Sequence, residues 1–561
     1  MKKALLSLII AATFLVCAMP FSGVLATEGE GFVYTIENGE VTITDYDGQP
    51  EGILTVPESI EGYPVTKIDD RALRSHPNMT GVVLPDSLKE IGSAAFMGSG
   101  IETINFPSSV EKIGSGILGE CKKLKSITVD DDNKYFCADD NGVLYNKDKT
   151  KIFRYPAGSG LSSYTIDETV ATVSGGAFAY SENLETVIFP SGLKIIENQA
   201  FYGCKKLNNI SLPTGLEKIG QLAFGETAHY SDDSKWDKDG VLYIGEYLIH
   251  NNGKFAGEYA IKDGTTLMAT DALAAMPQLT GVTFPESLKS ISEYGLASNL
   301  NLVNLTIPET IESIDSMAFR FCMKLEKVVI PASVTKIGDQ AFDFCESLRE
   351  VVLSDGLVSI GEAAFQSCRA LERITIPQSV TTIEMYAFNS CYKLKDVTLP
   401  DTLKHLGEKA FSQTGIKKII IPKGITKIAP AVFSACNNLE EIVLPDTITG
   451  IDDYTFDACS ALKTINYYGS EEQWKEIEVS TVSNDYFINA KVNFDYVRSG
   501  DVDGSFKINS SDALAILQST TGLVTLDGNR LAAADVDRDG KVLSKDALAV
   551  LQYSTGLITT L

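Results

Sequence analysis

Apolar residues recur along most of this chain with a fixed period of 23 residues. Residues 324–346 read KLEKVVIPASVTKIGDQAFDFCE, and residues 347–369 read SLREVVLSDGLVSIGEAAFQSCR. Each copy predicts a short β segment such as 325–330 and a second extended run such as 334–337. Pro331 suits the end of a strand but not its middle, and Gly338 permits a corner. The pattern predicts stacked coils that bury one continuous apolar column, because a single coil cannot bury its apolar side alone.

A two-residue slot, most often Ala-Phe, marks each copy, and its second position measures the repeat along the chain. Most spacings are 23 residues, two are 22, and two long gaps mark insertions at 126–165 and 226–262. This period lies in the range of leucine-rich repeats. We therefore expect a mainly β solenoid of about fifteen repeats over 63–465. The marker positions are Leu73, Phe96, Leu118, Phe178, Phe201, Phe224, Leu273, Leu296, Phe319, Phe342, Phe365, Phe388, Phe411, Phe433 and Phe456.

The two insertions carry the same short core, Asn-Gly-Val-Leu-Tyr at 141–145 and Asp-Gly-Val-Leu-Tyr at 239–243. Asn-Gly or Asp-Gly before alternating apolar residues predicts β-hairpins, here as small islands that project from the solenoid. Their aromatic residues favour packing within the hairpins, and a carbohydrate or partner site is the alternative. Residues 27–62 and 466–497 are predicted to cap the two ends, which would otherwise expose an apolar layer.

Eight of the ten cysteines lie three residues after a marker position: Cys121, Cys204, Cys322, Cys345, Cys368, Cys391, Cys436 and Cys459. An even cysteine count in a secreted protein usually indicates disulfides. These cysteines share one place in each coil beside core residues, so a ladder of small buried thiols is the favoured interpretation. Cys137 lies outside this ladder, and the pattern does not explain it.

Residues 498–561 contain two copies of a loop–helix unit, 34 residues apart. Oxygen ligands at places one, three, five and twelve of each loop describe an EF-hand-like calcium site. The second loop fits fully, with Gly540 at the turn. In the first, Ser505 replaces an acid and Phe506 replaces the glycine, so its binding is expected to be weaker. The candidate calcium ligands, with the seventh-place lysines, are Asp501, Asp503, Ser505, Lys507, Asn509 and Asp512 in loop one, and Asp535, Asp537, Asp539, Lys541 and Asp546 in loop two.

Charge and composition exclude several functions. The chain has 48 basic and 74 acidic residues, a net charge of −26, which disfavours nucleic-acid binding. Its four histidines lack ligand spacing, which weakens a zinc-enzyme or histidine-based hydrolase interpretation. Residues 1–26 have the layout of a secretory signal peptide, and their apolar run is short for a membrane anchor. No other stretch is long and apolar enough to predict a membrane span.

The repeats and both ends, residues 31–497, resemble the BspA-type family of bacterial leucine-rich-repeat surface proteins. That resemblance implies a surface or secreted binding protein without enzymatic activity, and it does not supply the ligand. Residues 499–559 closely resemble a type I-like dockerin, which implies a calcium-dependent fold that docks into a cohesin domain of a scaffoldin. The resemblance places cohesin recognition on the helices, at Ser510, Ser511, Leu517, Gln518, Ser544, Lys545, Leu551 and Gln552.

The sequence therefore predicts a non-catalytic, secreted component of a cellulosome-type assembly. The dockerin would attach it to a cell-surface or free scaffoldin, and the solenoid would bind a polysaccharide or protein ligand. One alternative is a free adhesin whose dockerin-like tail is only structural. Another is an accessory enzyme of polysaccharide degradation, which is disfavoured because the acidic residues spread over solenoid faces rather than converging on one site.

Overall fold

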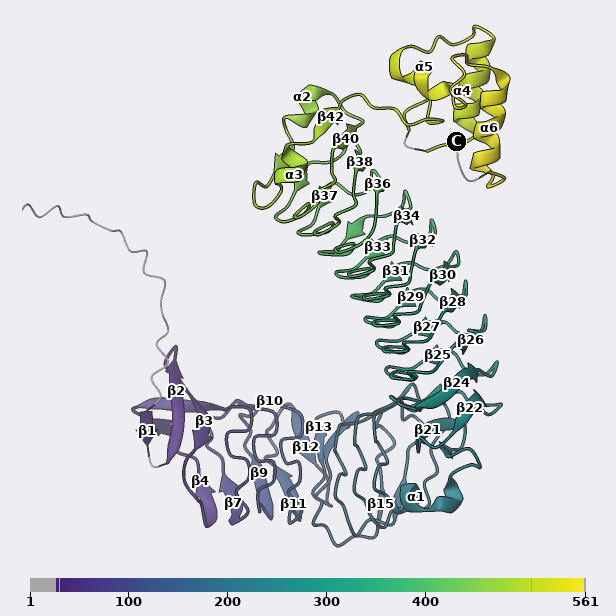
Figure 1. Cartoon of the computed structure of the whole chain (residues 1–561). Helices are drawn as coiled ribbons and strands as arrows, with labels where there is room; N and C mark the ends of the chain where they lie inside the picture. The colour runs from purple at the N-terminus through teal and green to yellow at the C-terminus, as the bar shows by residue number, and fades with distance from the viewer. Residues whose placement is uncertain (1–26, 30, 506, 559–560) are drawn as a thin grey trace, which may run out of the picture. The chain divides into compact units, whose positions relative to one another are not determined.

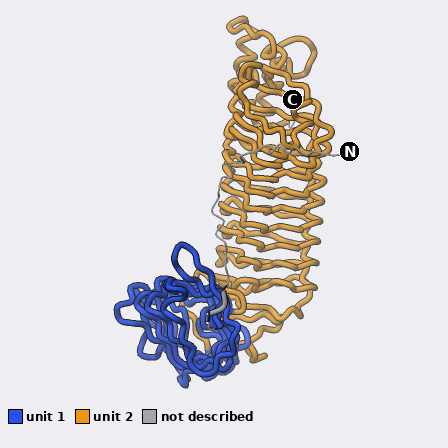
Figure 2. The backbone as a smooth tube through the Cα atoms, turned by 90° about the vertical axis from the view of Figure 1, so that its left-hand side faces the viewer, with its two compact units in different colours: residues 1–209, 223–228 blue, residues 210–222, 229–561 orange. Residues whose placement is uncertain are grey.

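The computed structural model describes residues 27–29, 31–505, 507–558 and 561 (Figure 1). The expected signal peptide at 1–26 lies outside these residues. The chain divides into two compact units, one running to Asn209 and including Ala223–Ala228, the other comprising Ile210–Leu222 and His229–Leu561 (Figure 2). The expected mainly β solenoid with a helical C-terminal region is confirmed. It has about 20 turns rather than fifteen, because strands of the islands and caps also join the stacked sheets.

Each coil contributes two short strands that pair in parallel with those of the next coil. Strand β28 (Lys327–Ile330) pairs with β30 (Glu350–Leu353), Lys327 opposite Glu350, and β29 (Lys336–Ile337) pairs with β31 (Ser359–Ile360). Partners are one 23-residue repeat apart, so equivalent side chains stack. Val328 and Ile330 point inward and are buried, whereas Lys327 and Val329 are exposed.

In the first unit, the strands belong to four sheets, and β5 joins the first of these by pairing with β6. They are β1 (Thr27–Gly29), β2 (Phe32–Glu37), β3 (Glu40–Tyr46), β6 (Tyr63–Ile68), β8 (Glu90–Ile91) and β10 (Lys112–Ile113), with β5 (Ser59–Ile60); β11 (Ser126–Val129), β9 (Thr103–Phe106), β7 (Met79–Val83) and β4 (Gly52–Thr55); β12 (Phe136–Ala138), β13 (Leu144–Asn146), β14 (Lys151–Arg154), β16 (Thr172–Val173) and β18 (Ile195–Ile196); and β15 (Ser163–Thr165) with β17 (Thr186–Ile188).

In the second unit, the remaining strands follow the same two ladders. They are β19 (Lys218–Ile219), β20 (Val241–Ile244), β21 (Tyr247–Asn251), β22 (Ala256–Ala260), β23 (Leu267–Met268), β24 (Gln278–Thr283), β25 (Ser290–Ile291), β26 (Asn304–Leu305), β27 (Ser313–Ile314), β32 (Arg373–Thr375), β33 (Thr382–Ile383), β34 (Asp396–Thr398), β35 (His405–Leu406), β36 (Lys418–Ile420), β37 (Lys427–Ile428), β38 (Glu441–Leu444), β39 (Gly450–Ile451), β40 (Thr464–Tyr467), β41 (Glu478–Val479) and β42 (Lys491–Asn493).

The marker residue of every coil lies between two residues in the left-handed region, two places before it and two places after it. Around Phe342 these are Gln340 (φ 56°) and Phe344 (φ 58°). Side chains other than glycine rarely adopt this conformation. Here it turns three alternate N–H groups toward the next coil, at 2.7 Å from Gln340 N to Glu362 O, 2.8 Å from Phe342 N to Ala364 O and 3.0 Å from Phe344 N to Gln366 O. These bonds offset the strain.

The marker phenylalanines form a stacked column in the core. Phe365 is fully buried, and its ring lies 5.3 Å from that of Phe342 and 5.4 Å from that of Phe388, nearly parallel to both. At the end of the solenoid, Phe487 of the C-terminal cap stacks on Phe456 at 4.6 Å. The cap therefore continues the column without a repeat of its own.

The ladder cysteines are buried, and each thiol donates a hydrogen bond to a backbone carbonyl of the preceding coil. Cys345 Sγ lies 3.3 Å from Phe319 O, and Cys368 Sγ lies 3.4 Å from Phe342 O. Ser99 Oγ makes the same bond, to Leu73 O at 3.1 Å. A small donor is thus the usual occupant of this place, although Met276 and His76 fill it in two coils. The nine cysteines of the described residues are all free thiols.

Native ladder thiols are expected to resist modification. Burial raises the pKa of Cys322 and Cys391 to about 12 and that of Cys436 to about 11, so thiolate is scarce at neutral pH. An aromatic disulfide reagent should modify at most Cys137, which is partly exposed, before denaturation and all eight ladder thiols after it. Mass spectrometry counts the adducts, and modification of several ladder thiols in the native protein would contradict the ladder.

One corner residue carries a partly buried carboxylate. Asp315 and Asp452 occupy the same place, four residues before their markers, but Asp452 lies 2.7 Å from Lys427 Nζ while Asp315 receives only a 3.2 Å bond from Ser313 Oγ. Burial raises the pKa of Asp315 above its usual 3.8. The folded state disfavours the charged form of Asp315, so ionisation of this carboxyl destabilises the fold. The destabilisation is fully present above the folded pKa and disappears as pH falls below the unfolded pKa of about 3.8.

Asp315→Asn is therefore expected to stabilise the protein at pH 7 by on the order of 1 kcal/mol, with no gain below the unfolded pKa. Asp452→Asn, which removes the partner of Lys427, is the matched control and should be neutral or destabilising. Thermal unfolding at neutral and acidic pH measures both. A stabilisation by Asp315→Asn that is equal at both pH values would show that the buried charge is not its cause.

The islands are built into the ladders rather than projecting freely from them. In the first, β12 and β13 pair antiparallel, and β14 then pairs in parallel with β16 of the solenoid. In the second, β20 and β21 pair antiparallel, and β21 pairs in parallel with β23. Most of their tyrosines are buried, among them Tyr145, Tyr155 and Tyr247. Tyr155 stacks on Phe178 of the solenoid at 5.0 Å, and Tyr247 donates its hydroxyl to Pro213 O at 2.7 Å. These aromatic residues therefore pack against the solenoid as well as within the hairpins.

The helices are short and cluster at the C-terminal end. Those in the second island and the C-terminal cap are α1 (Ala228–Ser231), a 3₁₀ turn η1 (Asp233–Lys235), α2 (Glu471–Trp474) and α3 (Asp485–Ile488). The C-terminal module contains α4 (Ser510–Thr520), α5 (Gly528–Ala534) and α6 (Ser544–Ser554). None of the helices in the described part of the chain has the length and hydropathy required of a membrane span.

Candidate calcium-binding module

The two loop–helix units of the C-terminal module share one local design. Asp512 and Asp546 lie in the first turn of α4 and α6 and are buried. Asp512 accepts N–H bonds from Asp503 at 3.1 Å and Asn509 at 2.9 Å. Asp546 accepts them from Val536 at 3.0 Å and Leu543 at 2.8 Å. Each carboxylate thereby closes its loop onto its helix.

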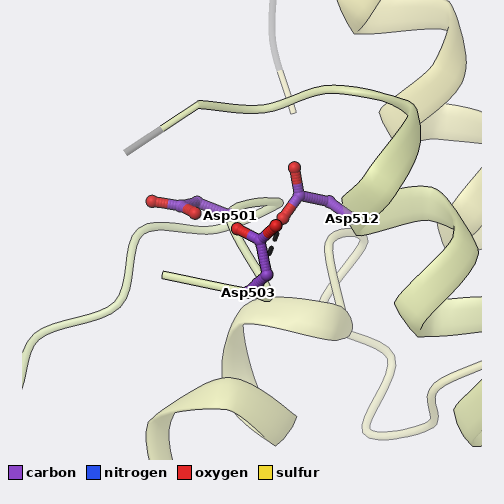
Figure 3. A group of neighbouring side chains, drawn as sticks. All are labelled: Asp501, Asp503 and Asp512. Carbon is purple, nitrogen blue, oxygen red and sulfur yellow. Dashed lines mark hydrogen bonds between the residues drawn. The ribbon is translucent and has the colours of Figure 1, made fainter. Parts of the chain in front are cut away.

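In the first loop, Asp501, Asp503 and Asp512 each offer an oxygen within 4.8 Å of the others. Figure 3 shows the carboxylates of Asp503 and Asp512 turned toward each other. Burial raises the pKa of Asp512. Asn509 has a structural role in this loop. Its side chain caps α4 by accepting the N–H of Ser511 at 2.7 Å.

The remaining predicted ligands of this loop, Ser505 and Lys507, lie on its exposed side. Ser505 donates its N–H to Asp503 Oδ1 at 2.9 Å. Its hydroxyl in turn accepts the N–H of Lys507 at 3.3 Å. Phe506 lies outside the described residues, so the structure does not describe the side chain that replaces the turn glycine.

In the second loop, Asp535, Asp537 and Asp539 form the group within 4.8 Å. Gly540 makes the turn with φ 84° and donates its N–H to Asp535 Oδ2 at 2.8 Å. Lys541 follows with its N–H on Asp539 Oδ1 at 2.9 Å. Asp546, the twelfth-place residue, lies outside this group in the structure.

A lysine of the following helix neutralises part of this cluster. The Nζ of Lys545 lies 2.5 Å from Asp537 Oδ2 and also pairs with Asp539. These contacts raise the pKa of Lys545 and, through Lys545, lower the pKa of Asp539. Lys545 was predicted from the sequence to bind the partner. In the structure it also contacts two candidate calcium ligands, Asp537 and Asp539.

The donor set fits calcium. Calcium takes six to eight oxygen ligands at about 2.3–2.6 Å, so its ligands lie within roughly 5 Å of one another. Both acidic groups meet that limit. Unpaired carboxylates at this spacing repel, which a divalent cation relieves. The residues present are therefore suited to holding calcium, with the second loop contributing three carboxylates before its turn glycine.

One contact of the first loop could not be predicted from the loop motif. Asp501 is fully buried, and Tyr468 of the C-terminal cap donates its hydroxyl to Asp501 Oδ2 at 3.0 Å. Arg498 reaches across the module to Tyr553 Oη at 3.0 Å. Tyr468 lies 33 residues from Asp501, outside the loop motif, which is why loop spacing alone could not find it.

The helices α4 and α6 present matching faces. Leu517 and Leu551 are 38% and 37% exposed, and Leu514 and Leu548 are 54% and 55% exposed. None of these four leucines belongs to the core of the module. The core positions are taken by Ala513, Ile516, Ala547 and Val550.

The predicted partner residues are all accessible. Ser510, Ser511, Ser544 and Lys545 are exposed, and Gln518 and Gln552 are partly exposed at equivalent places. Each helix therefore offers a similar surface, with a serine at its start and a leucine beside a glutamine about two turns later; Ser511 of α4 corresponds to Lys545 of α6.

Comparison with known families agrees with both parts of this architecture. The BspA type leucine rich repeat region matches residues 61–142, 149–254, 242–372 and 358–486, and the dockerin type I domain matches residues 499–553. The chain belongs to the BspA-type leucine-rich-repeat family and carries a C-terminal type I dockerin domain. Proteins of these families are typically non-catalytic and extracellular or surface-associated, and type I dockerins bind calcium.

Three solved structures illustrate the similarity. A leucine-rich repeat protein from Bacteroides ovatus is 22% identical over 83% of this chain and 99% of its own, with a TM-score of 0.35. A leucine rich cell surface protein from Faecalibacterium prausnitzii is 23% identical over 82% and 98%, with a TM-score of 0.25. A leucine-rich repeat protein from T. pallidum is 24% identical over 41% and 89%, with a TM-score of 0.28. No curated protein matches the chain significantly.

Proposed function

We propose that this protein is a secreted, non-catalytic binding component of a cellulosome-type assembly. Residues 498–561 dock into a scaffoldin cohesin in a calcium-dependent manner, and the solenoid over 63–465, closed by caps at 27–62 and 466–497, presents the ligand-binding surface. Residues 1–26 direct export. The observation that carries the docking proposal is the duplicated loop–helix unit, with an acidic group in each loop and a matching exposed face on each helix.

Calcium would act as a structural ion in this module. The carboxylates of each loop hold it, and the bound loop fixes the start of the following helix, where the partner residues lie. Because α4 and α6 carry equivalent residues, the module has two equivalent surfaces for a cohesin. Docking through either helix follows from this internal symmetry.

The docking proposal is tested with the full chain by calorimetric titration against the cohesins encoded in the same genome. We expect tight binding with calcium and its loss with a chelator. Failure to bind any of these cohesins would reject docking and favour a free adhesin whose C-terminal module is only structural.

The docking surfaces are tested by substitution on one helix or on both. Leu517→Ala or Leu551→Ala alone should leave binding through the other helix, whereas the double variant should lose it. If one single variant loses cohesin binding as completely as the double variant does, only that one helix surface is used. The unchanged helix of each single variant is its internal control.

A further inference from the structure

The second island contains a tryptophan, Trp236, that the hydrogen bonds of its turn do not require. In this island, Asp237 Oδ1 accepts the N–H groups of Asp239 at 2.9 Å and Val241 at 2.8 Å. Its Oδ2 accepts the hydroxyl of Tyr259 at 3.2 Å, and that hydroxyl lies 2.9 Å from the hydroxyl of Tyr243. A carboxylate, a tight turn and two tyrosines thus form a closed network.

The first island builds the same network from equivalent residues. Asp139 Oδ1 accepts the N–H groups of Asn141 at 3.0 Å and Val143 at 2.8 Å. Its Oδ2 accepts the hydroxyl of Tyr164 at 2.8 Å, and Tyr164 in turn contacts the hydroxyl of Tyr145. The turn residues of the two islands correspond one to one, 98 positions apart.

The two islands differ at the residue before the aspartate. Ala138 stands before Asp139 and pairs with Leu144, and Trp236 stands before Asp237 and pairs with Leu242 in the same antiparallel manner. Since an alanine completes the first network, the indole of Trp236 is not required by the turn. It is one of only two tryptophans in the chain.

The orientation of Trp236 is fixed by the segment before it. Its Nε1 donates to Tyr230 O at 2.9 Å, and the ring of Tyr230 lies edge-on to the indole at 5.2 Å. Tyr230 belongs to α1, whereas the corresponding part of the first island contains no helix. The local structure thus holds a partly exposed indole in one position.

Trp236 lies between two hollows in the surface, of about 890 Å³ and 500 Å³. Both hollows are also lined by Asp237 and Asp239. Asn252 and Lys254 line the larger one, and Lys262 lines the smaller. Acids and lysines alternate around the indole, although the chain as a whole has a charge of −26. A balanced set of hydrogen-bonding groups around a flat apolar ring suits a neutral polyhydroxylated ligand.

We propose that the hollows flanking Trp236 form a binding site for a neutral saccharide chain. A sugar ring stacks its C–H face on the indole, and its hydroxyls bond to the carboxylate of Asp239, the amide of Asn252 and the ammonium of Lys254. Two hollows on either side of one ring accommodate successive sugar units. This inference rests on the proposed role of the solenoid as a ligand-binding surface, and it names the ligand class and its place.

The test is a titration of the full chain with cellohexaose, xylohexaose, mannohexaose and, as a charged comparison, oligogalacturonate. Intrinsic fluorescence and calorimetry report binding. We expect at least one neutral hexasaccharide to change the tryptophan emission. Trp474→Phe should retain this change, because Trp236 is then the remaining tryptophan. Trp236→Ala should weaken binding at least tenfold and keep its fold, because an alanine occupies the equivalent place in the first island.

Tyr135→Ala, which removes a 45% exposed aromatic side chain from the first island, is the matched control and should bind normally. The proposal is overturned if no neutral hexasaccharide binds, if only the charged oligomer binds, or if Trp236→Ala binds as well as the unmodified chain. The same samples are also titrated with a cohesin. Saccharide binding depends on Trp236 and cohesin docking on residues 498–561, so the failure of one proposal can be told from the failure of the other.

Discussion

Asp535→Ala is expected to weaken calcium binding by the second loop by one to two orders of magnitude, and cohesin docking with it. Asp535 is one of three carboxylates within 4.8 Å, and it also accepts the N–H groups of Asp539 and Gly540. Its removal takes away a charged ligand and two bonds that shape the loop. Calcium affinity depends strongly on the number of charged ligands. Calorimetric titrations with calcium, and then with a cohesin, measure both losses.

The first loop provides the comparison. Asp501→Ala should have a smaller effect on docking than Asp535→Ala, because Ser505 takes the place of an acid in that loop. Asp527→Ala is the control for charge. Asp527 is an exposed acid of the same module, it lies outside both loops, and it makes no capping bond. Equal effects of Asp501→Ala and Asp535→Ala would contradict the ranking of the two loops.

Phe365→Ala is expected to destabilise the solenoid by about 3–5 kcal/mol. Phe365 is fully buried between Phe342 and Phe388, so its loss opens a cavity and removes two ring contacts. Each coil contacts only its neighbours, and the coils cannot shift to fill the space without breaking the hydrogen-bonded ladders. Chemical denaturation monitored by circular dichroism measures the change in the free energy of unfolding.

Two substitutions bracket this effect. Phe365→Leu should cost less than about 1.5 kcal/mol, since leucine natively fills the same place at positions 73, 118, 273 and 296. Tyr392→Ala, at a side chain that is 52% exposed, should change stability by no more than about 0.5 kcal/mol. A loss on Phe365→Ala no larger than that on Tyr392→Ala would show that the column does not carry the stability of these coils.

Much of the fold follows from period and residue type alone. The strand ends, the marker column and the cysteine ladder depend on which residues recur every 23 positions, so they could be predicted. The number of turns could not, because β14 and β21 enter the ladders without a marker residue. The left-handed positions also escaped prediction. They hold residues such as Gln340 and Phe344, whose conformation depends on bonds to the next coil rather than on glycine.

The candidate site was predictable where its chemistry is local. Asp535, Asp537 and Asp539 lie at fixed loop spacings, and the structure brings them together. Asp546 shares their spacing pattern, but its oxygens accept N–H bonds of the loop and helix start instead. The contact of Tyr468 with Asp501 joins distant segments, and no sequence period reports such a contact.

The fixed register between coils makes the solenoid adjustable in length. Residues 347–369 form one complete repeat. The strands on either side, β28 and β32, begin at Lys327 and Arg373, each 23 residues from the start of β30 at Glu350. Excising these 23 residues would bring β28 opposite β32 with side chains still in step, and would shorten the stack by about 4.8 Å. Gene rearrangements that add or remove whole repeats can thus tune the reach between the second island, the proposed saccharide site, and the dockerin module. Such changes leave the residues of both sites untouched.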